Sequence, residues 1–359
     1  IYSNNFSFCY NITMEKIRVA INGFGRIGRA FFKLAQYKKD EIEIVAINDL
    51  SPVDNIAYLL KYDSAYGRAP FEVSSSPGVL KANGKEIKYL NEKDPSKLPW
   101  KDLNVDVVLE STGVFASYAK SKVHLDAGAT RVVVSAPIKD EPREGVVGVT
   151  VLMGVNDDKL RVCDISSNAS CTTNAGGPVM KILEEGLGIE KALLNTIHGY
   201  TSSQTLVDSP NPKGRARAGR AGAQNIVPTT SGAAIATTKA VESLAGKFDG
   251  IALRVPVIVG SIVDITFVSK KPTTIEEVNE IFKKAAADPK WKGIFSVTDE
   301  DLVSSDIVGN TNASIIDLEY TRVVGGNLVK VLSWYDNEMG YANTLIKHII
   351  TTGNHAKRK

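Results

Sequence analysis

Short apolar runs, each followed by a turn, recur through the first half of the chain. Four of them have the composition of strands, at residues 17–21, 42–47, 105–109 and 131–134. Helix-forming stretches follow some of these runs, at residues 26–37 and 118–127. Strands that are apolar on both faces and are separated by helices are typical of a parallel sheet that is covered on both sides. The pattern therefore predicts a doubly wound α/β domain.

From about residue 170 the pattern changes to longer strands with helices between them. The strands are expected at residues 191–197, 262–268 and 328–335. A helix is expected at residues 275–287, and this half is predicted to be an α+β domain with a mainly antiparallel sheet. Residues 209–222 are rich in Pro, Gly and Arg, so we expect a long ordered loop, which usually serves a function.

Composition narrows the classes to which the protein can belong. Its 43 basic and 40 acidic side chains leave a net charge of +3, which argues against a nucleic-acid or membrane-surface partner. It has no run of about 20 apolar residues that could span a bilayer, and residues 1–13 do not resemble a signal peptide. Because Met14 directly precedes the first strand, residues 1–13 are interpreted as a disordered extension or a mis-assigned start. Three irregularly spaced cysteines favour the cytoplasm.

A glycine-rich turn follows the first predicted strand and opens the first predicted helix. The spacing Gly23-x-Gly25-x-x-Gly28 permits a tight turn, lets a pyrophosphate approach the backbone and lets the helix pack on the strand. Asp49 closes the second strand about 20 residues after Gly28, where a carboxylate binds a ribose diol. The pattern predicts a Rossmann-type NAD site, although a plain turn with a capping aspartate stays open. The Asp49 carboxylate favours NAD over NADP, but Arg26 and Arg29 weaken this preference, since either could reach the 2′-phosphate of NADP.

Cys171 stands among hydroxyl and amide side chains that are typical of a helix N-terminus. A thiol there meets the positive end of the helix dipole, which lowers its pKa and favours a nucleophilic thiolate. The pair Gly176–Gly177 and Pro178 argue against a helix that begins at Cys171, and a buried structural cysteine stays open.

His198 is the candidate base because it ends an apolar strand and precedes a polar loop, a position from which catalytic groups project. His124 and His348 fall within predicted helices and are expected at the surface or near helix ends. The pattern predicts no metal site.

Taken together, these segments resemble the phosphorylating glyceraldehyde-3-phosphate dehydrogenase family from about residue 16 to about residue 350. The resemblance is carried by six collinear segments, at residues 21–29, 46–50, 59–64, 110–113, 169–174 and 333–338. It implies that a Cys171 thiolate attacks an aldehyde, that His198 is the base, and that inorganic phosphate cleaves the resulting thioester. The implied substrate is glyceraldehyde 3-phosphate, with NAD as the cofactor and a homotetramer as the assembly.

The resemblance also assigns binding roles and domain boundaries. The cofactor contacts that it implies beyond the three glycines are Arg26, Ile27, Asp49, Lys93, Ser135, Asn337 and Tyr341. Inorganic phosphate is assigned to Ser170, Thr172, Ser231 and Gly232, and the phosphate of the substrate to Thr201, Arg220 and Arg254. We expect an NAD-binding domain at residues 14–169, with a C-terminal helix at 336–359 packed back on it, and a catalytic domain at residues 170–335.

Three departures from the family and two rival functions qualify this expectation. Ser231 stands where a threonine is common in the family, and it keeps the hydroxyl. Ala175 stands where the family often has a second cysteine, and Ser209–Pro210 stands where strict NAD users often have Leu-Pro. Erythrose-4-phosphate dehydrogenase, in which water releases the thioester, is one alternative. A non-catalytic binding or regulatory relative is the other.

Overall fold

The computed structural model describes residues 15–142, 144–211 and 214–357, so the extension expected at residues 1–13 lies outside the described residues. The first half folds around a nine-stranded sheet with the order β10-β11-β9-β8-β1-β2-β7-β6-β5. Its strands are β1 (Ile17–Asn22), β2 (Ile42–Asn48), β5 (Val73–Ser76), β6 (Val79–Ala82), β7 (Lys85–Leu90), β8 (Val107–Glu110), β9 (Arg131–Val134), β10 (Gly148–Thr150) and β11 (Ile165–Ser167).

Parallel pairing runs through most of this sheet, from β10 across to β7, and β5 and β6 add an antiparallel edge. The helices of this half are α1 (Arg26–Ala35), α2 (Val53–Lys61) and α3 (Tyr118–Asp126). Strand β1 lies between β2 and β8, so the chain builds the sheet first on one side of β1 and then on the other. In doubly wound sheets, ligands bind at the carboxyl ends of the strands where the direction changes in this way. The fold class predicted for this half is confirmed.

The second half folds around a seven-stranded sheet with the order β13-β14-β12-β15-β18-β17-β16. Its strands are β12 (Ile189–Gly199), β13 (Val227–Thr230), β14 (Phe248–Val255), β15 (Ser261–Ser269), β16 (Phe295–Thr298), β17 (Ser314–Val324) and β18 (Leu328–Tyr335), and its helices are α4 (Cys171–Gly186), α5 (Ala233–Ala240) and α6 (Ile275–Ala287). Most neighbours pair antiparallel, while β12 with β14 and β16 with β17 pair parallel. The mainly antiparallel sheet predicted for this half is confirmed.

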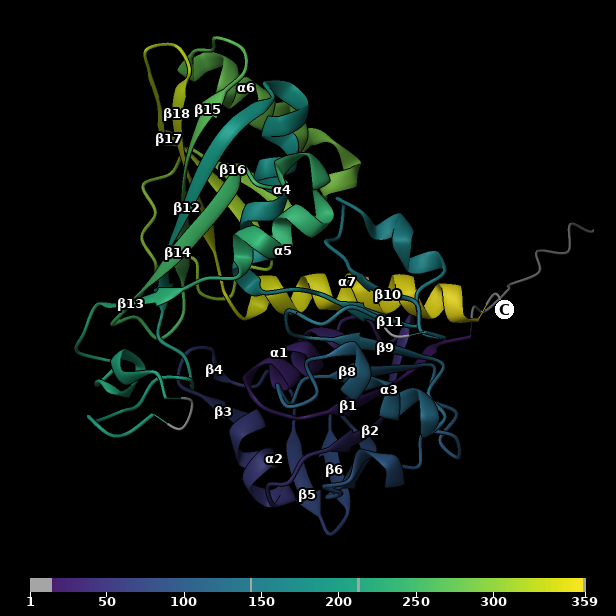
Figure 1. Cartoon of the computed structure of the whole chain (residues 1–359). Helices are drawn as coiled ribbons and strands as arrows, with labels where there is room; N and C mark the ends of the chain where they lie inside the picture. Colours follow the sequence, from purple (N-terminus) through teal and green to yellow (C-terminus); the bar gives the residue numbers. More distant parts are fainter. Residues whose placement is uncertain (1–14, 143, 212–213, 358–359) are drawn as a thin grey trace, which may run out of the picture.

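The C-terminal helix α7 (Met339–Ala356) lies between the two sheets in Figure 1 and packs on α1 and β1. Its apolar side chains Leu345 and Ile349 join the core of the first half. Residues 336–338, which connect β18 to α7, therefore lie where the two halves of the molecule meet. Among the described residues, no helix is both long and apolar enough to cross a membrane.

Helix α4 begins at Cys171, although the sequence argued against that start. Its N-cap Ser170 accepts a hydrogen bond from the Thr173 N–H at 3.1 Å, and Pro178 lies inside the helix. A Cβ atom at Gly177 would come within 2.5 Å of a methyl group of Leu152. Close packing on the neighbouring segment therefore accounts for this glycine, and tertiary contacts outweigh its low helix propensity.

Candidate active site

Two side chains of the second half meet where α4 begins and β12 ends, next to the cores of both halves. Cys171 is the first residue of α4, and His198 lies near the end of β12. The Sγ atom of Cys171 is 3.3 Å from Nε2 of His198, and the two residues are 27 positions apart. The thiol is thus within reach of a group that can remove its proton. The structure places the two predicted catalytic residues together.

The other ring nitrogen of His198 has two competing partners. Its Nδ1 atom is 2.6 Å from the carbonyl oxygen of Gly199 and 2.5 Å from Nη1 of Arg254. Nδ1 carries either a proton or a lone pair, so it donates to Gly199 or accepts from Arg254, but not both. When it donates to Gly199, the lone pair of Nε2 faces Cys171, and this is the tautomer that can act as a base.

Burial sets the resting protonation of this pair. Burial and the neighbouring Arg254 cation lower the pKa of His198 to about 3, so its ring is neutral at pH 7 and available to accept a proton. Burial also raises the pKa of the Cys171 thiol, against the opposing effects of Arg254 and of the Thr172 N–H at the helix start. The lowered pKa that the sequence led us to expect is not found. The thiol therefore needs His198 to become a nucleophile.

Tyr335 lies beside the predicted catalytic pair, and sequence reasoning assigned it no role. It is buried at the end of β18, and its hydroxyl is 3.0 Å from Oγ1 of Thr172 and 2.8 Å from Oγ1 of Thr196. The edge of its ring faces the ring of His198, with the centroids 5.9 Å apart. Tyr335 thus supports both the helix start and the base. Its partners lie 163 and 139 positions away along the chain, so no local pattern could have revealed them.

The predicted cofactor site is a cavity of about 500 Å³ at the carboxyl ends of β1, β2 and β8. Four of the predicted cofactor residues line it, namely Gly23, Gly25, Asp49 and Lys93. The Phe24 N–H donates to Oδ2 of Asp49 at 2.7 Å and the Ser51 N–H donates to Oδ1 at 2.9 Å, which fixes the carboxylate. Each oxygen keeps a second lone pair for a ribose hydroxyl.

Two of the three glycines of the turn, Gly23 and Gly28, are required by their surroundings. Gly23 has a φ of +92°, and a Cβ atom at Gly28 would clash with the carbonyl oxygen of Gly23. At Gly25 a Cβ atom would meet nothing within 4 Å, so its backbone borders open space at the start of α1. Free backbone N–H groups, close approach and a fixed carboxylate fit a dinucleotide such as NAD.

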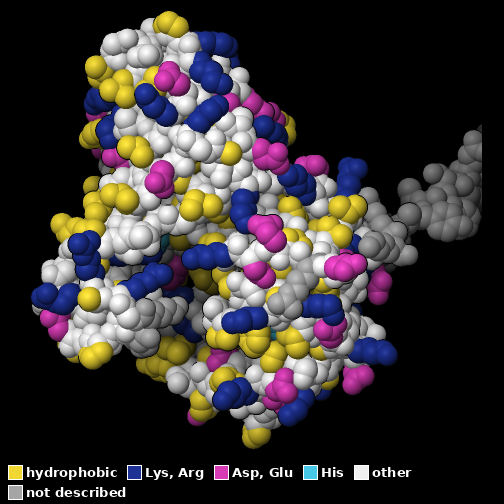
Figure 2. All heavy atoms as spheres, in the orientation of Figure 1, with side chains coloured by type: hydrophobic (Ala, Val, Ile, Leu, Met, Phe, Trp, Pro, Cys, Tyr) yellow, Lys and Arg dark blue, Asp and Glu magenta, His cyan; other side chains and the backbone are white. Residues whose placement is uncertain are grey.

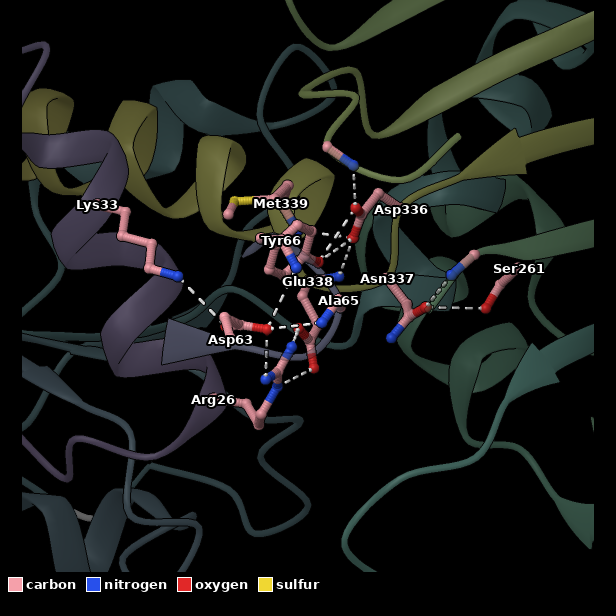
Figure 3. Close-up of polar contacts among 12 residues, drawn as sticks. Arg26, Lys33, Asp63, Ala65, Tyr66, Ser261, Asp336, Asn337, Glu338 and Met339 are labelled. Carbon is pink, nitrogen blue, oxygen red and sulfur yellow. Dashed lines mark hydrogen bonds and ion pairs between the residues drawn. The ribbon is translucent and has the colours of Figure 1, made fainter. Parts of the chain in front are cut away.

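The idea that Arg26 or Arg29 could reach a 2′-phosphate is wrong. Arg26 donates from Nε to one oxygen of Glu338 at 2.8 Å and from Nη2 to the other at 2.5 Å, and it also bonds Asp63 at 3.0 Å. Figure 3 shows its guanidinium held between these two carboxylates. Arg29 is buried and donates to the carbonyl oxygen of Phe24. Neither guanidinium is free for a ligand, although the Arg26 backbone remains at the helix start.

The other predicted cofactor residues lie outside this cavity. Ile27 is half-buried in α1, and Ser135 directly follows β9. Asn337 is buried between β18 and α7, and its Oδ1 atom accepts hydrogen bonds from the second half of the molecule. Tyr341 is buried, and its hydroxyl donates to the carbonyl oxygen of Ala169 at 3.0 Å. Tyr341 therefore supports the turn before Cys171.

The residues predicted to bind phosphate are only partly brought together. The Thr172 hydroxyl is committed to Tyr335, whereas Ser231 and Gly232 lie at the start of α5. Arg254 borders a cavity of about 570 Å³ that Arg215 and Arg217 also line. Figure 2 shows a hollow near the middle of the face that it draws, with Lys and Arg side chains around it.

Two other predicted phosphate residues lie apart from Arg254. Thr201 lines a separate cavity of about 290 Å³. Arg220 is largely exposed, and its Nε atom pairs with Asp208 at 2.6 Å. In this conformation the structure does not place Thr201, Arg220 and Arg254 around one anion.

His124 does lie in the last turn of α3, near the helix end as one of the two expectations had it, whereas His348 lies in the middle of α7. The alternative expectation of a surface position is wrong for both, because both side chains are fully buried. His124 accepts from Nε1 of Trp100 at 3.2 Å and faces Glu110 at 3.1 Å. His348 lies 3.0 Å from Oδ1 of Asn168 and 2.7 Å from the hydroxyl of Ser166. These polar partners satisfy both ring nitrogens, which permits burial. Among the described residues, no group of three or more His, Cys, Asp or Glu side chains could hold a metal ion.

Comparisons with known proteins identify relatives over more than nine tenths of the chain. Residues 17–118 match the family model described as the NAD binding domain of glyceraldehyde 3-phosphate dehydrogenase, and residues 170–337 match that of its C-terminal domain. Glyceraldehyde-3-phosphate dehydrogenase 1 of Streptomyces avermitilis is 47% identical over 340 residues, which cover 94% of this chain and 99% of the relative. The enzyme of the same name from Thermotoga maritima is 49% identical over 331 residues, covering 92% and 97%.

Proposed function

The chain belongs to the glyceraldehyde 3-phosphate dehydrogenase family, and on this premise we propose that it oxidises glyceraldehyde 3-phosphate with NAD and inorganic phosphate to 1,3-bisphosphoglycerate. It is an NAD-dependent oxidoreductase, and the family places it in glycolysis. The observation that carries the proposal is the 3.3 Å contact between Sγ of Cys171 and Nε2 of His198 at the start of α4. The relatives reported above are named for glyceraldehyde 3-phosphate, which does not favour the erythrose-4-phosphate alternative.

In the first step the Cys171 sulfur attacks the aldehyde carbon, and a thiohemiacetal forms. His198 takes the thiol proton through Nε2 and returns it to the aldehyde oxygen, which becomes a hydroxyl. This step needs the tautomer in which Nδ1 donates to Gly199, because only then does Nε2 have a lone pair. Tyr335 packs against the ring and holds it in place.

In the second step the thiohemiacetal is oxidised to a thioester on Cys171. NAD, when bound, supplies the acceptor for the hydride. His198 takes the hydroxyl proton through Nε2, so negative charge does not build up on the oxygen. Inorganic phosphate then attacks the thioester carbon, the acyl phosphate leaves, and the sulfur regains its proton from His198. The thiol and the neutral imidazole are thereby restored.

The anion sites belong to the same proposal. Arg254 is supported as the ligand of the substrate phosphate because its guanidinium contacts the catalytic histidine and borders a cavity with Arg215 and Arg217. Arg220, which is exposed, and Thr201, which is half-buried, are proposed as the other ligands of the substrate phosphate. Ser170, Ser231, Gly232 and the N–H of Thr172 are proposed for inorganic phosphate.

The cofactor is bound through Gly23, Gly25, Gly28, Asp49 and Lys93 at the end of the first sheet. The backbone at Arg26 and Ile27, together with Ser135, extends this site. Asn337 reaches the nicotinamide end, with Tyr341 supporting the turn behind it. Residues 14–169 and 336–359 form the NAD-binding domain, and residues 170–335 form the catalytic domain. The two separate sheets support this division.

Steady-state kinetics test the proposal. NADH formation from glyceraldehyde 3-phosphate should require inorganic phosphate or arsenate, and erythrose 4-phosphate should be the poorer substrate by kcat/KM. Equal turnover without either anion, or a preference for erythrose 4-phosphate, would contradict it.

A homotetramer is the proposed assembly. The outer face of the second sheet carries exposed apolar side chains, among them Leu193 at 66% and Ile251 at 55%, and Ile235 of α5 lies 63% exposed nearby. Leu193 and Ile235 line one surface cavity. Exposed apolar side chains that lie together are typical of an interface between subunits. Light scattering should give about four times 38.7 kDa, and Leu193→Glu should lower that mass. A fully active monomer at micromolar concentration would overturn the assignment.

The cytoplasm is the proposed compartment. Cys163 and Cys171 are both free thiols, and the proposed mechanism needs Cys171 to stay reduced. Fractionation of the source cells should place the NADH-forming activity with the cytoplasmic enzymes.

A further inference from the structure

A buried hydroxyl connects the strand of the catalytic base to the residue proposed at the nicotinamide end. Ser261 is the first residue of β15 and is 2% exposed. Its Oγ atom is 3.2 Å from the backbone nitrogen of Gly199, next to His198, and 3.1 Å from Oδ1 of Asn337. Figure 3 shows the side chains of Ser261 and Asn337 pointing toward each other.

The direction of each hydrogen bond follows from the groups involved. The backbone N–H of Gly199 can only donate, so the oxygen of Ser261 accepts there and its own proton is available for Asn337. The N–H of Gly260 also donates to Oδ1 of Asn337, at 3.1 Å. Two donors thus converge on one oxygen of the amide. They distinguish Oδ1 from Nδ2, although the two ends of an asparagine amide are nearly equal in size.

The two donors therefore fix the opposite end of the amide as well. With Oδ1 held by Gly260 and Ser261, Nδ2 of Asn337 faces the other way (Figure 3). Gly260 cannot be substituted without disturbing the backbone, because it has a φ of +100° and a Cβ atom there would come within 2.6 Å of the carbonyl oxygen of Ser304. Removing the Ser261 hydroxyl is thus the simplest way to weaken this restraint.

The backbone at Asn337 is held from the other half of the molecule. The next residue, Glu338, pairs with Arg26 at the start of α1, and the Glu338 N–H donates to Asp336 at 2.8 Å. The backbone of Asn337 is therefore held by the first half of the molecule, through its neighbour Glu338. The side-chain amide of Asn337 is held by the second half, through Ser261 (Figure 3). A ligand group that meets Nδ2 is placed relative to both.

We propose that Ser261 is a positioning residue that presents the NH₂ group of Asn337 to the carboxamide oxygen of bound NAD. It also ties that amide to the strand end that carries His198. The inference rests on the proposed function, and it adds the residue that sets the orientation of the amide. An amide turned the other way would direct Oδ1 at the carboxamide oxygen, and two acceptors repel each other.

The experiment measures binding by calorimetry on Ser261→Ala and on a matched control, Ser333→Ala. Ser333 lies on β18 of the same sheet, is fully buried, and bonds only another serine hydroxyl, that of Ser314 at 2.8 Å, among the contacts described. The ligands are NAD and thionicotinamide adenine dinucleotide, in which sulfur, a weak acceptor, replaces the carboxamide oxygen. Thermal melting of each variant without ligand reports on folding.

Wild type and Ser333→Ala should prefer NAD over the thio analogue by the same factor. Ser261→Ala should bind NAD about three- to tenfold more weakly, as expected for one lost hydrogen bond, and should lose most of that preference. Ser261→Thr, which keeps a hydroxyl, should restore the preference and serves as the second test if the alanine variant melts early.

An equal loss of affinity for both ligands in Ser261→Ala, or no loss for either, would overturn the inference. A different result would contradict the proposed function. In that case the wild type itself would not bind NAD or would not oxidise glyceraldehyde 3-phosphate.

Discussion

Replacement of His198 by asparagine probes the link between the thiol and its base. Asparagine keeps an amide near the position of Nδ1, where Gly199 can accept a hydrogen bond, but it has no atom at the position of Nε2. Cys171 would then have to ionise without help. The variant isolates the 3.3 Å contact that carries the proposed mechanism.

The size of the effect follows from the burial of the thiol. An ordinary cysteine with a pKa of about 8.5 is about 3% thiolate at pH 7, and burial raises the pKa of Cys171 above its ordinary value. Loss of the base should therefore lower the rate of attack on the aldehyde at least about 30-fold, because only about 3% of an ordinary thiol is ionised at pH 7. The oxidation step loses its proton acceptor as well, so we expect kcat to fall by about 10² to 10⁴, the range for one general base.

The rate of Cys171 alkylation should depend on pH differently in the variant and in the wild type. In His198→Asn the rate of Cys171 alkylation by iodoacetamide should be low at pH 7 and should rise with pH as the unassisted thiol ionises. The wild-type rate should depend less on pH over the same interval, because His198 takes the proton. The dissociation constant for NAD should stay within about twofold, since His198 does not line the cofactor cavity. A variant that kept kcat within threefold, or whose alkylation profile matched the wild type, would refute the reasoning.

Three further predictions concern cofactor choice, acid stability and thiol selectivity. The Asp49 carboxylate should repel a 2′-phosphate by about 1–4 kcal/mol per charge, so Asp49→Ala should narrow the ratio of kcat/KM for NAD over NADP; equal use of both by the wild type would contradict this. Burial lowers the pKa of His348 to about 3, below about 6.5 in the unfolded chain, so its contribution to stability is present above pH 6.5 and is lost as pH falls. Urea unfolding should show that the free energy of unfolding falls between pH 7 and pH 5 by about 2 kcal/mol less in His348→Gln than in the wild type. An equal fall in the two proteins would exclude this role of His348. Burial raises the pKa of Cys163 to about 11, so one equivalent of iodoacetamide at pH 7 should label Cys171; peptide mapping that found the label mainly on Cys163 would reverse the assignment.

Features encoded in adjacent residues could be predicted from the sequence. The turn at Gly23–Gly28, the strand that ends just before Asp49 and the helix Ile275–Ala287 all depend on local spacing, and each is found where it was expected. The sequence analysis missed the strands β5, β6 and β7. These strands are short, and one face of each is largely polar, so the apolar pattern is weak.

Features that depend on distant partners could not be predicted. Helix α4 continues through Gly177 because that residue packs closely on Leu152, a contact that outweighs its low helix propensity. His348 is buried because Asn168 and Ser166, 180 and 182 positions away, satisfy its ring. The role of Tyr335 likewise depends on hydroxyl groups from two other elements. Such partners are adjacent only after folding, so they leave no pattern in the sequence.

The central claim is that Cys171 carries the substrate through oxidation. The most direct measurement mixes the enzyme with glyceraldehyde 3-phosphate and NAD without phosphate, quenches the mixture in acid, and maps the modified peptide by mass spectrometry. The account predicts about one NADH per chain, one acyl group on Cys171, and release of that group when inorganic phosphate is added before the quench. An acyl group on another residue, or continued NADH formation without phosphate and with no acyl group on Cys171, would contradict it.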